Sequence, residues 1–280
     1  MTTSEFYIGW MPKAPFEFAR HIRKVLLILL PLVLIVAYLL SSSQKKFSTA
    51  NFEFGKITKV TGIYINKPLL MLKVSDGKSG YVTVPLVGYG KHGAETAITN
   101  IEKEKNISLL NKEVTLKGSL LYSGGKTLLQ VSKDDNMLVN VGKEVSGSLL
   151  PQQKDLGVQT IKGEIIDPKC YFGVMKPGEG KVHRDCAIRC ILGGMPPVLH
   201  VQNDKGESNY YILVGPNGER MNEAVKDFVA EPIEVNARVV QQDDWIVLYV
   251  NDSKFNRISY ARMIGKDVLA CSDKSVLNKY

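Results

Sequence analysis

Hydrophobic residues alternate with polar residues in short runs, and these runs occur in two similar sets along the chain. One set falls within residues 53–145 and the other within 158–252. In each set three runs are followed by a helical stretch and then by two more runs, with Asp-Gly, Gly-Gly or Asn-Gly turns among them. Alternation between such turns is typical of strands with one buried face. The sequence therefore predicts two β domains with the same order of elements.

The helical stretch of each set lies between its third and fourth predicted strands. The predicted helices span Ala94–Lys105 and Glu219–Ala230, and the apolar residues of the second are spaced to cover one end of a sheet. Three strands, a helix and two strands resemble the OB-fold, a small five-stranded barrel. We expect a mainly β protein with two tandem OB-like barrels, each with one helix, at 44–150 and 151–258, followed by a tail at 259–280.

An apolar run without charge, Val25–Leu40, precedes both sets and has basic residues on either side. Such a run, extended by the serines that follow it, predicts a transmembrane helix over 25–43. Residues 1–24 would then form a cytoplasmic or interfacial segment. A cleaved signal peptide is the alternative, but no A-x-A site follows the run.

The net charge of +8 comes mainly from residues 41–150, close to the predicted membrane span. Anionic lipid headgroups would attract such a surface, although scattered lysines also suit a simply solvated one. Clustered cysteines favour an extracytoplasmic setting, so we expect a single-pass protein of the inner membrane with its β domains in the periplasm. Membrane lipid is then a partner through residues 25–43. Nucleic acid is not expected, because the second domain has no charge excess.

The second set contains an insertion, residues 169–195, with no counterpart between Lys67 and Pro68 of the first. Three of the four cysteines of the chain lie in it. In OB-folds the loop between strands 1 and 2 often binds ligands, and the insertion falls in that loop. The same β domain occurs twice, and only the second copy carries an insertion. This indicates that the insertion carries the special chemistry of the protein.

Four residues of the insertion have metal-ligand chemistry and form the pattern C-x12-H-x2-C-x3-C: Cys170, His183, Cys186 and Cys190. A helix over Val182–Leu192 would place the last three on one face. Cys170 could fold back over that face through the glycine-rich turn. Three thiolates and one imidazole suit zinc, copper or an iron–sulfur cluster.

Disulfide and redox interpretations remain open beside the metal interpretation. The chain has an even number of cysteines, so Cys271 could pair with one of the three in the insertion. Cys170 bonded to Cys186 or Cys190 would be the first bridge, because two cysteines one helical turn apart are poorly placed to bridge each other. A labile bridge among the same residues would form a redox-active thiol pair.

The segments GEIIDPKC and HRDCAIRCILGGMPP together resemble an element of bacterial extracytoplasmic OB-fold-like domains. The resemblance covers residues 163–197 and implies a bacterial envelope setting without implying an activity. It marks five positions: Asp167, Cys170, His183, Cys186 and Cys190. Asp167 and His200, which lies on a predicted strand near the insertion, are candidate accessory residues.

Familiar catalytic motifs are absent from the sequence, which has no glycine-rich phosphate loop, no G-x-S-x-G and no H-E-x-x-H. Asp243 and Asp244 are interpreted as turn residues. We expect a membrane-anchored accessory protein, more plausibly not an enzyme, whose insertion binds a transition metal or docks a protein partner in a respiratory or metalloenzyme complex. A disulfide-stapled structural module and a redox-active thiol protein are the alternatives.

Overall fold

The chain forms two units, Met1–Phe47 and Ser48–Tyr280, so both β domains belong to one compact body. The computed structural model describes residues 14–43, 49–78, 80–133, 137–203, 207–251, 255–260 and 263.

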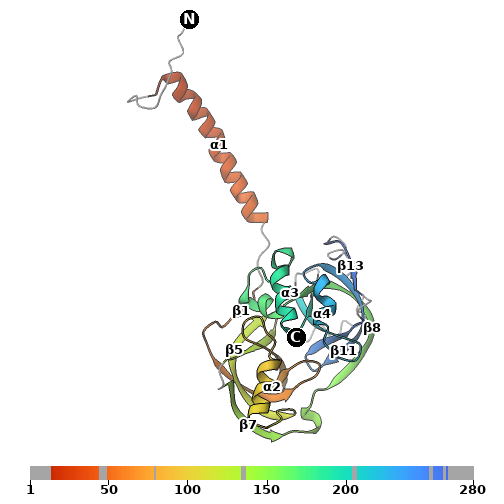
Figure 1. Cartoon of the computed structure of the whole chain (residues 1–280). Coiled ribbons are helices and arrows are strands. Elements are labelled where there is room, and N and C mark those ends of the chain that lie inside the picture. The colour runs from red at the N-terminus through yellow and green to blue at the C-terminus, as the bar shows by residue number, and fades with distance from the viewer. Residues whose placement is uncertain are drawn as a thin grey trace. The chain divides into compact units, whose positions relative to one another are not determined.

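The first unit contains one long helix, α1 (Phe16–Ser43), shown in Figure 1. Its 28 residues give a length of about 42 Å, more than the ~30 Å hydrocarbon core of a bilayer. The helix is long and apolar enough to cross a membrane. The helix begins before the predicted span of 25–43, since residues 16–24 continue it toward the N-terminus.

Five strands of the first β domain close into a barrel with a helix between its third and fourth strands. Neighbours pair in the order β2-β3-β4-β6-β5-β2, with β4 and β6 parallel and the other pairs antiparallel. The helix buries Ile98 and Ile101 and lies close to its predicted bounds. The elements are β1 (Asn51–Phe52), β2 (Thr58–Ile65), β3 (Met71–Ser75), β4 (Tyr81–Val87), α2 (Glu95–Glu104), β5 (Lys112–Ser123), β6 (Lys126–Val131), β7 (Leu138–Glu144) and η2 (Gly147–Leu149).

The second β domain closes in the same order, β8-β9-β10-β12-β11-β8, again with one parallel pair, β10 and β12. This strand order, repeated in both barrels, confirms the prediction of a mainly β fold with two small OB-like barrels. Its elements outside the insertion are β8 (Gln153–Ile166), β9 (Val198–Gln202), β10 (Ser208–Val214), α4 (Asn222–Val225), η5 (Lys226–Phe228), β11 (Pro232–Gln242), β12 (Trp245–Tyr249) and β13 (Phe255–Arg257).

The helix of the second barrel is shorter than the predicted Glu219–Ala230. A turn precedes it, in which the Gly215 N–H donates to the Glu219 carbonyl oxygen over 2.8 Å. The single α-turn α4 continues into the 3-10 turn η5, and Ala230 then adopts a positive φ of 60°. The segment ends at Phe228, because the next residue, Val229, has extended backbone angles.

The two barrels share a hydrophobic core as well as having their own. Ile65, Val87 and Leu121 of the first barrel pack in one cluster with Trp245 and Val247 of the second. The insertion also contributes apolar side chains to this shared cluster: Cys170, Tyr171, Phe172, Cys190 and Met195. The insertion is therefore part of the interface between the barrels.

The last hairpin of each barrel also contacts the other barrel, on the face formed by that barrel's second and third strands. The turn between β11 and β12 reaches β4, where the Thr83 N–H donates to Asp244 Oδ1 over 2.9 Å and Trp245 Nε1 donates to the Thr83 carbonyl over 2.8 Å. The turn between β5 and β6 reaches β10, where Ser123 Oγ lies 2.7 Å from the Tyr210 hydroxyl. OB-folds commonly bind ligands on this face. In both barrels the other barrel occupies it.

Candidate metal centre

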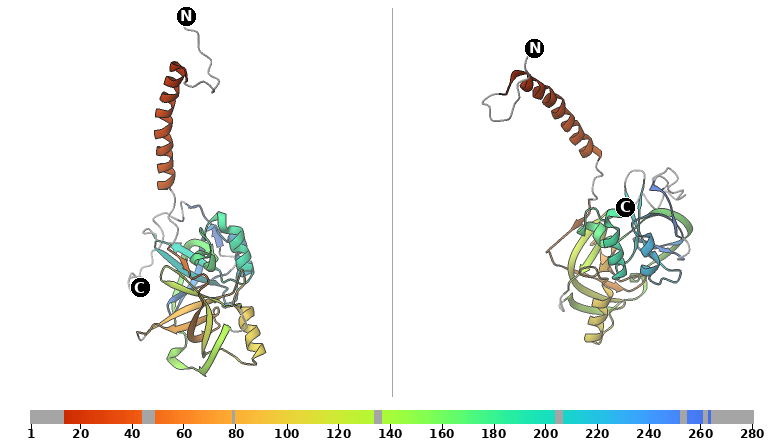
Figure 2. Two further views of the ribbon diagram at one scale, coloured as in Figure 1. Left: turned by 90° about the vertical axis from the view of Figure 1, so that its left-hand side faces the viewer. Right: turned by 45° about the horizontal axis from the view of Figure 1, so that its top comes forward.

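The insertion consists of three helical elements between β8 and β9: η3 (Cys170–Val174), η4 (Lys181–His183) and α3 (Arg184–Leu192). The helix predicted over Val182–Leu192 is present, with its first residues in the 3-10 turn. The helix α3 lies beside α4, as Figures 1 and 2 show. Asn222 joins the two, because its Nδ2 donates to the carbonyls of Ile191 at 2.6 Å and Met195 at 2.7 Å.

Cys170 reaches the other candidate ligands because the chain turns sharply where β8 ends. The Tyr171 N–H donates to the Asp167 carbonyl over 3.0 Å, which closes the turn. Gly173 has a φ of 133°, and a Cβ there would lie 2.7 Å from the backbone nitrogen of Phe52. Only glycine permits both the conformation and the close approach to β1. The turn is therefore held against the first barrel.

The structure gathers the candidate ligands into two groups of three that share one sulfur. Donor atoms of Cys170, His183 and Cys186 lie within 4.8 Å of one another, and so do those of Asp167, Cys170 and Cys190. Donors around a tetrahedral zinc ion are about 3.8 Å apart for Zn–S bonds of about 2.3 Å. Small side-chain movements would bring either group to that spacing.

Each group contains one buried polar atom without a hydrogen-bond partner. In the first group this atom is Nε2 of His183, which is 3% exposed, and in the second it is Oδ2 of Asp167, which is 0% exposed. The other oxygen of Asp167 accepts a hydrogen bond from the Lys169 N–H at 2.9 Å. A buried polar atom without a partner is costly, commonly by about 1–3 kcal/mol. An ion bound in each group would supply the partner that its buried atom lacks.

Two lysines connect the site to the loop between β4 and α2 of the first barrel. Lys169 is buried, and its Nζ donates to the carbonyls of Gly88 at 2.7 Å and Gly90 at 2.8 Å. From the loop itself, Lys91 Nζ donates to Cys186 Sγ over 3.6 Å. Neither lysine is among the site residues expected from the sequence. The local sequence pattern does not mark these lysines, because their hydrogen bonds join segments of different barrels.

Burial and hydrogen bonding together shift the pKa values of the site residues. Hydrogen bonding with Cys190, burial and the nearby Asp167 carboxylate all raise the pKa of the Cys170 thiol. Burial lowers the pKa of His183 even though Asp167 opposes the shift. Burial likewise lowers the pKa of Lys169, again against the attraction of Asp167. A neutral imidazole is the form that binds metal, whereas the thiols must lose their protons when an ion enters.

The remaining expected residues lie apart from these two groups. His200 Nε2 is 3.1 Å from the Tyr171 hydroxyl and 2.9 Å from Ser208 Oγ, and its Nδ1 is 3.5 Å from a carboxylate oxygen of Glu179. His200 therefore supports the fold of the insertion from the β9 side. Cys170, Cys186 and Cys190 are free thiols, and Cys271 lies outside the described residues.

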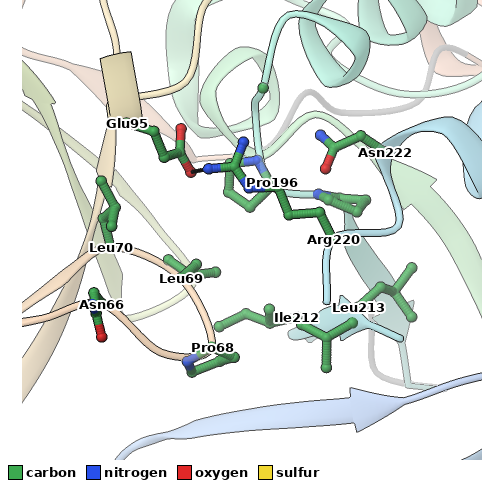
Figure 3. Close-up of a pocket in the computed structure, with 13 residues that line it drawn as sticks. Asn66, Pro68, Leu69, Leu70, Glu95, Pro196, Ile212, Leu213, Arg220 and Asn222 are labelled. Atoms are coloured by element: carbon green, nitrogen blue, oxygen red, sulfur yellow. Dashed lines mark ion pairs between the residues drawn. The ribbon is translucent and has the colours of Figure 1, made fainter. Parts of the chain in front are cut away.

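A shallow pocket of about 70 Å³ opens between the barrels, and Figure 3 shows its lining. Apolar side chains such as Pro68, Leu69 and Ile212 form one side. Arg220 Nη2 reaches across to Glu95 Oε1 at 2.8 Å, which closes part of the opening. The pocket has room for a few water molecules only and includes none of the candidate metal ligands.

Comparison with protein families, with curated proteins and with solved structures finds no match to this chain, so its function is inferred from the site itself.

Proposed function

We propose that this protein is a membrane-anchored metal-binding protein, in which Cys170, His183 and Cys186 bind a transition-metal ion at the interface of two OB-like barrels. One observation carries the proposal. The imidazole of His183 is buried with its Nε2 unpartnered, and one of its ring nitrogens lies within 4.8 Å of the sulfurs of two free thiols. Buried histidines normally satisfy both ring nitrogens, so a histidine held this way suits metal coordination.

The chemistry of the three ligands limits which metal ions the site can bind. Two thiolates and one imidazole are soft to intermediate ligands, which suit Zn²⁺ or Cu⁺ and are poor partners for Mg²⁺ or Ca²⁺. The half-buried position of Cys186 leaves one ligand near solvent, which offers a route for entry. An accessory role without catalysis accords with the burial of Cys170 and His183.

The proposed setting is the inner membrane of a bacterium, with α1 as the anchor and the barrels in the periplasm. The length and apolar character of α1 support the anchor. The envelope setting also follows from the resemblance of residues 163–197 to extracytoplasmic domains. The partner would be a protein of the same membrane, such as a respiratory or metalloenzyme complex.

Metal content of ligand variants tests the proposal. The full chain would be purified in detergent with a reductant, loaded with Zn²⁺, dialysed and analysed for metal per chain. His183→Gln and Cys186→Ser should reduce the bound zinc, because each removes a ligand. His200→Gln is the matched control, a buried histidine outside both groups, and should retain wild-type zinc. Wild-type protein without zinc, or equal zinc in both histidine variants, would contradict the proposal.

Docking of a protein partner at the insertion is a second candidate function. The insertion exposes apolar side chains at Val182, which is 84% exposed, and at Met175 and Leu192. A photo-crosslinking residue at position 182 would test this function in membranes. Crosslinks to one membrane protein at 182, but not at the exposed position 158 on the second barrel, would support it. Equal labelling at both positions would contradict it.

A further inference from the structure

We propose that the insertion binds a second divalent ion of the zinc class, held by Asp167, Cys170 and Cys190, with the Cys170 sulfur bridging the two ions. This inference rests on the proposed function, because the bridge requires the ion bound by Cys170, His183 and Cys186. It differs from a single site with four ligands, the arrangement that the spacing of the cysteines suggests.

The arrangement of the donors supports two ions. Cys170 Sγ belongs to both groups of donors, whereas Cys190 groups with Asp167 and not with His183 and Cys186 among the described residues. A thiolate sulfur has several lone pairs and can bind two ions at once. One ion at the centre of all four Cys/His donors would require Cys190 to move toward His183. Two ions sharing Cys170 use the donors nearly where they lie.

Asp167 provides independent support for the inner ion. Its side chain is fully buried, and only one of its two oxygens has a hydrogen-bond partner. The nearby ammonium group of Lys169 does not supply the missing partner, because it donates to the carbonyls of Gly88 and Gly90. A carboxylate oxygen of Asp167 lies within 4.8 Å of the sulfurs of two free thiols, so a cation held by all three groups would compensate the buried charge.

The carboxylate also narrows the choice of metal. Cu⁺ prefers sulfur and imidazole, whereas zinc accepts carboxylate oxygen together with thiolate. A site that includes Asp167 therefore favours a divalent ion of the zinc class over Cu⁺. Cobalt(II) can replace zinc in such a site and provides a spectroscopic probe.

Native mass spectrometry of the full chain in detergent, loaded with Zn²⁺, counts the ions directly. Wild-type protein should carry two zinc ions. Asp167→Asn and Cys190→Ser should carry one, because they remove only inner ligands. His183→Gln and Cys186→Ser should also carry one, and Cys170→Ser, which removes the bridge, should carry none. His200→Gln should keep both ions.

A second measurement needs only the wild-type protein, so it tests the second ion even if a variant does not fold. The metal-free chain would be titrated with Co²⁺ and followed by electron paramagnetic resonance. Two ions joined by a sulfur bridge couple magnetically, so the signal should rise with the first equivalent and fall with the second. Signals that grow in proportion to two equivalents would exclude a bridge and overturn the inference.

The outcomes separate this inference from the proposed function. A single zinc ion in wild-type protein, lost on changing either His183 or Cys190, would indicate one four-ligand site and overturn the second ion alone. Two ions that both persist in Asp167→Asn would also overturn it. Absence of zinc from wild-type protein would overturn the second ion and the proposed function together.

Discussion

Lys73 and Asp243 form an ion pair of 3.0 Å between the two barrels, although they are 170 residues apart in the chain. Both side chains are largely buried, at 5% and 11% exposed. Asp243 Oδ1 also accepts from the Gln152 N–H at 3.1 Å. The Asp243 side chain, which lies in the hairpin turn of the second barrel, therefore contacts both the first barrel and the connection between the barrels.

Asp243→Asn should destabilise the protein strongly, because it leaves the Lys73 charge buried without its counter-charge. Loss of one partner of a buried pair costs about 3 kcal/mol or more. Asparagine tolerates the positive φ of position 243, so the turn itself should persist. Chemical denaturation of the full chain in detergent would measure the change. The control is Asp155→Asn, which removes an exposed partner of Arg238 and should change stability little.

The two barrels should unfold in one transition, because Trp245 of the second packs in the same cluster as Leu121 and Leu128 of the first. Leu128→Ala should lower the stability of both barrels by about 2–5 kcal/mol. Tryptophan fluorescence and far-ultraviolet circular dichroism, recorded on the same denaturation series, would check this. Two separated transitions, with only one shifted by the substitution, would show that the barrels are independent domains.

Gly193→Ala should loosen the metal site without touching a ligand. A Cβ at this position would lie 2.0 Å from the Lys91 carbonyl oxygen, so the loop of the first barrel must move away. The same movement weakens the hydrogen bond from the Gly93 N–H to the Gly193 carbonyl, now 3.0 Å long. Zinc affinity should fall by about tenfold or more, corresponding to about 1.4 kcal/mol. A competition titration with a chromophoric chelator would measure it.

Leu192→Ala is the control for Gly193→Ala, since Leu192 is the exposed last residue of α3, directly before Gly193. It should leave zinc affinity close to the wild-type value. If the two variants bind zinc equally well, the contact between the barrels does not shape the site.

Glu231 should make the anchoring of the insertion depend on pH. Partial burial acts to raise its pKa, but the hydrogen bond from Arg257 and the charge of Arg184 outweigh it and hold the pKa below the usual 4.5. A lowered carboxylate pKa stabilises the fold above pH 4.5, and this contribution disappears as the pH falls through the lowered value. Its size is about 1 kcal/mol.

Glu231→Gln tests this contribution by removing the charge while keeping the shape. The variant should be less stable than wild type at neutral pH, and the difference should shrink below pH 4.5. Thermal unfolding at a series of pH values would show it. A difference that stays constant from pH 7 to pH 3 would rule out the charge of Glu231 as its source.

The orientation of the chain in the membrane is testable in spheroplasts, whose inner membrane is intact. In spheroplasts, a protease added outside should digest residues beyond 43 and leave a fragment protected by the membrane. Protection of the barrels until the membrane is broken would place them in the cytoplasm. Recovery of a soluble form that begins near Gln44 would instead indicate a cleaved signal peptide.

Local patterns in the sequence predicted much of the fold. Alternation and turn residues predicted the order of strands and helix along the chain in both barrels, and the apolar run predicted the long N-terminal helix. The helix predicted over Glu219–Ala230 was too long at both ends, because Glu219 belongs to the turn that Gly215 opens and the chain passes into a 3-10 turn after Val225. Local signals thus predict an element better than its ends.

Contacts between the barrels were not predictable in the same way. Asp243 and Asp244 look like ordinary turn residues, yet they bind Lys73 and Thr83 of the other barrel. Among the site residues, the spacing of the cysteines indicated a metal site, but not that Asp167 and Cys190 form a group apart from His183. That division depends on how the chain turns after β8, which only the folded structure specifies.

X-ray absorption at the zinc edge tests the central claim most directly, because it reports the atoms bound to the metal in the full chain. The account predicts a mixed shell, with sulfur at about 2.3 Å and nitrogen or oxygen at about 2.0–2.1 Å. The sulfur contribution should fall in Cys186→Ser and stay unchanged in His200→Gln. A shell of oxygen and nitrogen alone, without sulfur, would mean that the zinc lies elsewhere and that the insertion is not a metal centre.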